Sequence, residues 1–237
     1  MLQVVSNGLK VLRYIRRRDD FKMWFFDSGM ILFVLPAMFF AMYAQNKVKN
    51  AYAHYSRLYP AGKLTGAQVA RLLLDNAGLE QVKVLQVEGR LTDHYDPRSK
   101  VVRLSAPIYG DSSLASLGIA AHEVGHALQH DHDYLPLSIR NSFVPLAGFG
   151  SQAAFPLFLI GFLFGGGSLS VFMDIGIALF LFAVLFQVIT LPVEFNASSR
   201  ALVLLQDGGY LRGEELSGAK KVLNAAALTY VAALAVA

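Results

Sequence analysis

The sequence of 237 residues contains no cysteine and few charged residues. Without cysteine the chain can form neither disulfides nor thiolate metal sites. Charged residues make up 16% of the chain and hydrophobic residues 54%, whereas about a quarter of the residues of a typical soluble domain are charged. The composition therefore excludes a disordered chain, a collagen-like chain and a coiled coil, and it is too apolar for an ordinary water-soluble domain.

The formal net charge of +4 comes entirely from the first 22 residues. This segment has six Lys or Arg and two Asp residues, whereas residues 23–237 have fifteen basic and fifteen acidic residues. We therefore expect no nucleic-acid partner for the rest of the chain. We interpret residues 1–22 as a basic leader and hypothesise that translation starts at Met23; the alternative is a genuine basic segment at the membrane surface.

Long uncharged runs predict membrane helices. Residues 23–44 include 17 consecutive uncharged positions, which is the lower limit for crossing a bilayer at about 1.5 Å per residue. Residues 143–191 contain two longer runs separated by a glycine-rich turn and predict a membrane hairpin. Residues 222–237 form a shorter apolar run, which is either a fourth span or a helix packed on the others. The alternative, that the runs are core helices of a soluble protein, is disfavoured by their length.

The polar stretch of residues 45–142 has the character of a domain. Residues 65–77 predict an amphipathic helix that is capped by a threonine. Residues 81–87 and 100–105 alternate like strands around a turn-rich DHYDPRS segment. A further helix is expected at residues 113–129.

This last helix contains the sequence HEVGH, in which His122 and His126 flank Glu123. Residues four apart lie on one face of a helix, so both imidazoles can bind one tetrahedral zinc ion. Glu123 lies beside them and can take a proton from water that the zinc activates. The alternative is a pair of histidines on a polar helix face, with Glu123 as a neighbour that balances their charge.

A catalytic zinc ion needs a third protein ligand, and two residues compete for this role. His132 follows His126 at the spacing found in metzincins, but Gln129 occupies the position where that pattern has a glycine for a sharp turn. Glu194 is the second candidate, because a membrane hairpin returns the chain to the side that it left. We expect Pro192 to start a helix whose first turn directs Glu194 toward the histidines. We therefore favour Glu194.

Three blocks of sequence resemble those of the YugP-like neutral zinc metallopeptidases of bacterial membranes. They are DHYDPRSKVVRLS, AAHEVGHALQH and LPVEFNASSRAL, and the resemblance extends from about Met23 to the C-terminus. It implies a zincin-like peptidase in which His122 and His126 bind zinc, Glu123 is the catalytic carboxylate and Glu194 stands at the position of the third ligand.

One position departs from the pattern of better-studied gluzincins. Those enzymes have an aspartate four residues after the ligand glutamate, which orients a zinc-binding histidine, whereas this chain has Ser198. The group that holds the His122 tautomer therefore stays open at this point.

Other residues near the motif have weaker assignments. The strand at residues 101–104 is a candidate for pairing with an extended substrate. The polar cluster Asp93, His94 and Asp96 lies next to it, and we interpret His94 as a structural or supporting residue rather than a ligand. The candidates for an oxyanion donor are Tyr95, Tyr109 and Tyr134.

Basic residues predict the orientation in the membrane. Those on the catalytic side are Lys47, Lys49, Arg57, Arg140, Arg200, Lys220 and Lys221, whereas the tip of the hairpin has none. By the positive-inside rule we expect a multi-pass cell-membrane protein whose site faces the cytoplasm.

These patterns predict an α+β, mostly helical fold: a zincin-like catalytic domain with a short β-hairpin or sheet and the HExxH helix, fused to three or four transmembrane helices. The expected segments are a leader (1–22), a first span (23–44), the catalytic domain (45–142), a hairpin (143–191), a helix with the third ligand (192–221) and a C-terminal helix (222–237).

The expected function is that of an integral-membrane zinc endopeptidase with one catalytic Zn²⁺. Its partners would be the lipid bilayer and membrane or membrane-near polypeptides, which are the substrates. The alternative is a membrane scaffold or chaperone-like module whose zinc is structural or absent.

Overall fold

The computed structural model describes residues 28–164 and 168–236, so the leader, Met23 and the glycine turn of the hairpin lie outside it. In chain order its elements are α2 (Ser28–Tyr55), α3 (Gly66–Asn76), β1 (Lys83–Val87), β2 (His94–Asp96), β3 (Val101–Ser105), α4 (Ala106–Tyr109), α5 (Leu114–Asp131), α6 (Leu135–Phe164), η1 (Ser168–Ser170), α7 (Val171–Asp207) and α8 (Gly213–Val236). The expectation of a mostly helical chain with a small sheet is confirmed.

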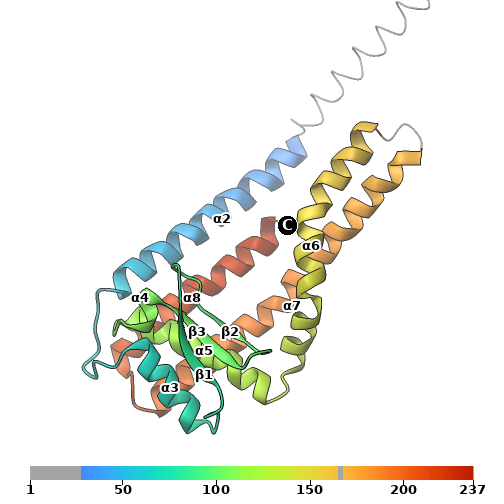
Figure 1. Cartoon of the computed structure of the whole chain (residues 1–237). Helices are drawn as coiled ribbons and strands as arrows, with labels where there is room; N and C mark the ends of the chain where they lie inside the picture. The colour runs from blue at the N-terminus through green and yellow to red at the C-terminus, as the bar shows by residue number, and fades with distance from the viewer. Residues whose placement is uncertain (1–27, 165–167, 237) are drawn as a thin grey trace, which may run out of the picture.

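The long helices α2, α6, α7 and α8 extend from the end of the molecule that holds the sheet (Figure 1). The helices α6 and α7 form an antiparallel hairpin, and α8 packs against α2 and α7. Within the described part of the chain, α6, α7 and α8 are long and apolar enough to cross a membrane. The helix α2 is not among them, although its first half exposes many apolar side chains, so a first span at residues 23–44 stays a prediction.

Both long helices of the hairpin continue through proline. The helix start that we expected at Pro192 is wrong, because α7 contains this residue in its interior. Likewise α6 begins at Leu135 and contains Pro145 and Pro156. Proline usually stands in the first turn of a helix, but long apolar helices tolerate it where neighbouring groups satisfy the freed carbonyl. Glu194 therefore projects from the middle of a helix rather than from its first turn.

The sheet has the strand order β1-β3-β2. The two predicted strands both form, but β1 and β3 pair in parallel, and β2 comes from the segment that we expected to be a turn. The strands β2 and β3 are antiparallel and form a β-hairpin. Its turn begins at Asp96, whose carboxylate accepts hydrogen bonds from the backbone N–H groups of Arg98 and Ser99.

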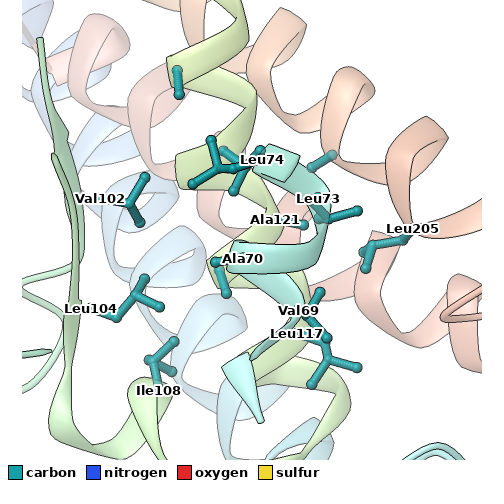
Figure 2. Packing of buried hydrophobic residues seen from close by; sticks show 14 of the residues in the cluster. Val69, Ala70, Leu73, Leu74, Val102, Leu104, Ile108, Leu117, Ala121 and Leu205 are labelled. Atoms are coloured by element: carbon teal, nitrogen blue, oxygen red, sulfur yellow. The ribbon is translucent and has the colours of Figure 1, made fainter. Parts of the chain in front are cut away.

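The core lies between α3, β3 and α5 (Figure 2). Thr65 and Gln68 form a capping box that starts α3. The apolar side chains of α3 lie between β3 and α5 and contact both elements. The residues that meet are Val69, Ala70, Leu73 and Leu74 of α3, Val102 and Leu104 of β3, and Leu117 and Ala121 of α5. Burial of each large side chain contributes about 1.5–3 kcal/mol, and this core holds α5 in place beneath the sheet.

The helix α5 crosses α7 at Gly125. A Cβ atom on Gly125 would lie 2.5 Å from the carbonyl oxygen of Ala197, which is closer than any real side chain approaches. Only glycine therefore allows the two backbones to come this near. The crossing point lies next to His126 on α5 and three residues after Glu194 on α7.

Replacement of Gly125 by alanine is expected to force α5 and α7 apart. We expect the free energy of unfolding to fall by about 1–3 kcal/mol, the usual cost of overpacking, in a denaturant titration of the detergent-solubilised protein. The matched control is Gly148→Ala in α6, where a Cβ would meet nothing within 4 Å. Equal stability of the two variants would contradict the close crossing.

Candidate metal site

Three side chains converge where α5 crosses α7. The ligand atoms of His122, His126 and Glu194 lie within 4.8 Å of one another. Oε2 of Glu194 is 3.2 Å from Nε2 of His122 and 3.7 Å from Nε2 of His126. Both histidines thus direct the same ring nitrogen toward one carboxylate that is almost completely buried.

The other ring nitrogen of His126 is held by Gln129. Nδ1 of His126 lies 2.9 Å from Oε1 of Gln129. The orientation of this amide is determined, because its Nε2 donates to the carbonyl of Val193 and to Oδ1 of Asn196. Oδ1 of Asn196 also accepts from Nε of Arg200. Since an amide oxygen only accepts hydrogen bonds, Nδ1 of His126 is the donor to Gln129, and in the neutral imidazole this arrangement leaves the lone pair on Nε2 for a metal ion.

Ser198 contacts the ring nitrogen of His122 that would face the aspartate in gluzincins. Its hydroxyl lies 3.1 Å from Nδ1 of His122. Ser198 stands one helical turn after Glu194 on α7, so the position that is aspartate in gluzincins still contacts the histidine, with a neutral group in place of a charged one. A hydroxyl can accept the Nδ1 proton and leave Nε2 free.

This donor set fits a zinc ion. Two imidazoles and one carboxylate are the ligands of many catalytic zinc sites, and outer hydrogen bonds that fix the histidine tautomer are typical of metal sites. Here both Nε2 atoms and Oε2 of the carboxylate face one small region, while each Nδ1 has an oxygen partner. The residues present can therefore hold zinc with three protein ligands.

Glu123 lies directly beside the histidines, on the side of α5 that faces β2. Its side chain is buried, and burial raises the pKa of Glu123 to about 7, an effect that the nearby backbone N–H of Tyr95 on β2 partly offsets by favouring the charged form. The edge strand β2 thus positions the carboxylate next to the proposed ligands.

Two residues that the sequence did not assign to the site contact Glu194. Nη2 of Arg140, on α6, lies 3.4 Å from Oε1 of Glu194. The side chain of Tyr230, on α8, lies beside the same carboxylate and lines the cavities that border it. Arg140 had been counted only as a basic residue near a span, and Tyr230 lies in an apolar run. Neither residue stands in a motif, so only the packing of α6 and α8 against α7 reveals them.

Two cavities meet at this group of residues. A cavity of about 560 Å³ lies between α2, α8 and the loop before β2. A cavity of about 130 Å³ lies between β2 and the start of α6. Both are lined by Asp93, His122, Glu123, Glu194 and Tyr230. Two of the three converging side chains, those of His122 and Glu194, therefore border both cavities.

The remaining candidates lie elsewhere or have structural contacts. His132 is the C-cap of α5, and its Nδ1 pairs with Arg200 rather than with the His122 group. His94 lines the small cavity and contacts the carbonyl of Thr92 through Nδ1. Asp93 accepts hydrogen bonds from the backbone and hydroxyl of Ser105.

The turn and tyrosine candidates also have partners. Asp96 pairs with Arg103, and hydrogen bonds from Ser99 and Arg103 hold the pKa of Asp96 well below its usual range. The hydroxyl of Tyr95 bonds to His130, and Tyr109 packs on the core. Tyr134 begins the turn into α6, because its carbonyl accepts from the N–H of Leu137.

The expected role of the strand at residues 101–104 is wrong. This strand, β3, is the central strand of the sheet and pairs with β1 on one side and β2 on the other. Its backbone groups are already used, so it cannot pair with a substrate.

Comparisons with known proteins agree with these observations. A family model described as "Putative neutral zinc metallopeptidase" matches residues 30–237. The chain is similar to the "Putative membrane protease YugP" of Bacillus subtilis (strain 168), with 48% identity over 203 residues, which cover 86% of this chain and 89% of that protein. No solved structure matches the chain.

The zinc affinity of single variants tests the proposed ligand Glu194 and the hydrogen bond of Gln129 to His126. We expect the purified protein to bind one zinc ion, Glu194→Gln to abolish tight binding, and Gln129→Met to weaken it by about 10- to 100-fold, the usual effect of losing an outer partner of a metal-binding histidine. The measurement is competition with a chromophoric chelator, and unfolding curves show whether each variant is folded.

His132→Ala is the control in this series, because His132 lies outside the converging group. It is expected to bind zinc like the wild type. Loss of zinc in His132→Ala together with retention in Glu194→Gln would contradict our choice of the third ligand.

Proposed function

The chain belongs to the family of neutral zinc metallopeptidases, and we propose that it is an integral-membrane endopeptidase that hydrolyses membrane or membrane-near polypeptides. The observation that carries the proposal is the convergence of His122, His126 and Glu194, with Glu123 beside them, at the junction of two cavities. In this proposal α5, the sheet and α7 form a zincin-like catalytic unit of the gluzincin type.

In the proposed mechanism His122, His126 and Glu194 would hold the zinc ion. The bound ion would supply a Lewis acid that polarises the scissile carbonyl and lowers the pKa of water. The carboxylate of Glu123 takes a proton from the attacking water and passes it to the nitrogen of the leaving amine. Burial of Glu123 keeps bulk water from competing for that proton.

Two further residues support this chemistry. Arg140 balances the charge of Glu194 and lines the small cavity, so its guanidinium is available to a substrate carbonyl or carboxylate. Tyr230 lines both cavities, and in this proposal its hydroxyl donates to the oxygen on which charge develops during attack. Tyr230 thus takes the role for which the sequence suggested Tyr95, Tyr109 or Tyr134.

The second candidate function is a membrane scaffold whose zinc is structural or absent. A structural zinc site is closed by four protein ligands. Among the described residues the converging group has three, and a general base and two cavities adjoin it. These features favour catalysis over a scaffold.

Replacement of Glu123 by glutamine separates the two functions. Glu123→Gln keeps the size of the side chain but cannot take up a proton, so we expect kcat for a casein-derived peptide mixture to fall by about 10²–10⁴-fold. Zinc content, measured by elemental analysis of the same sample, is expected to stay at the wild-type value.

Tyr230→Phe is the companion variant, because it removes one hydroxyl and leaves Glu123 intact. It is expected to lower kcat by less than Glu123→Gln does, with little change in zinc content. Bound zinc in the wild type without any Glu123-dependent cleavage would support the scaffold instead.

We also propose that the site faces the cytoplasm. The support is the excess of Lys and Arg on the catalytic side, which includes Arg140 and Arg200. A phosphatase that is active only outside the cytoplasm, fused at Gly166 between the segments that form α6 and α7, is expected to be active. The same reporter fused between Arg57 and Thr65 is expected to be inactive, and the reverse pattern would contradict this orientation.

A further inference from the structure

The larger of the two cavities has an unusual lining for a space that reaches a polar site. Its volume of about 560 Å³ is within the range of about 300–1,000 Å³ that is usual for ligand pockets. Away from the proposed metal site its walls come from α2, α8, the start of α5 and the loop before β2. Most of the side chains there are apolar, among them Val48, Ala53, Leu91, Ile119, Val222, Leu223, Ala226 and Ala227.

Small residues create this space. The helices α2 and α8 pack side by side, and alanine occupies positions 53, 226 and 227 where both helices border the cavity. Their single methyl groups leave a hollow that leucine or phenylalanine would fill. Small side chains on both helices thus contribute to the hollow.

Part of the polar lining of this cavity is shared with the small cavity. Asp93, His122, Glu123, Glu194 and Tyr230 line both this cavity and the small cavity. The small cavity, at about 130 Å³, adds polar groups such as His94, Arg140 and Asn141. A peptide whose carbonyl lies at the shared residues therefore has an apolar space on one side and a small polar space on the other.

We infer that the larger cavity binds a bulky apolar side chain of the substrate next to the scissile bond, so that the enzyme selects apolar segments of polypeptides. This inference rests on the proposed peptidase function. A polypeptide is the occupant that the geometry favours, because the cavity is continuous with the residues that would act on a peptide bond. Lys49 and Arg90 also line this cavity.

The first test measures binding without cleavage. Full-length Glu123→Gln protein, loaded with zinc and reconstituted in lipid nanodiscs, is titrated with fluorescent decapeptides that differ only in one central residue: phenylalanine, leucine, alanine or glycine. We expect Kd for the phenylalanine and leucine peptides to be about 10- to 100-fold lower than for the alanine and glycine peptides, because a buried apolar side chain contributes that much to binding.

Variants that fill the cavity should remove this preference. We introduce Ala53→Phe or Ala226→Phe and expect Kd for the bulky peptides to rise to the value for the alanine peptide. The matched control is Ala51→Phe, since Ala51 is two residues earlier on α2 and lines a separate groove. Ala51→Phe is expected to keep the wild-type preference.

Two results would overturn the inference: equal affinity for all four peptides, or an unchanged preference in both filling variants. The second result would be expected if lipid chains rather than peptide side chains occupied the cavity. A cleavage assay of the same peptides with Glu123 intact tests the proposed function separately. Selective binding without Glu123-dependent cleavage would reject the peptidase and retain the apolar binding site, whereas unselective cleavage would reject the site and retain the peptidase.

Discussion

The close contact of α5 with α7 at Gly125 is the constraint on which the proposed site depends. A helix that presents two histidines four residues apart can supply only two metal ligands, so the third must come from another element. Because Gly125 has no side chain, the backbone of α7 approaches α5 near Ala197. This approach brings the carboxylate of Glu194 to within hydrogen-bond distance of His122. The site is therefore a property of a helix pair rather than of one motif.

The contact between α5 and α7 also determines how the two histidines are oriented. Ser198 on α7 contacts His122, and Gln129 on α5 links His126 to Val193 and Asn196 of α7. Buried polar groups are costly unless they are paired, and here each donor of the Gln129 amide has an acceptor on α7. These bonds add specificity to an apolar crossing, because a shift of one helix by a turn would leave several of them unmade.

Much of the fold follows from local patterns in the sequence. The amphipathic helix α3, the strands β1 and β3, and the long apolar helices are each indicated by periodicity, caps or length. The errors have non-local causes. Pro192 usually marks a helix start, but neighbouring helices in an apolar bundle allow α7 to continue through it. The parallel pairing of β1 with β3, and the strand β2 between them in the chain, depend on contacts that no short window of sequence contains.

For the site, the sequence alone determined the HEVGH spacing, the acidic residue Glu194 in a matching block, and the return of the chain by a hairpin, because helical periodicity and chain connectivity are local properties. Tertiary structure decided what surrounds them. Gln129 seemed to be only a departure from the metzincin pattern, yet it orients His126. Arg140 and Tyr230 approach Glu194 from two other helices. Their positions depend on how α6 and α8 pack against α7. That packing is determined by the volumes of side chains along the whole length of these helices, which no short motif contains.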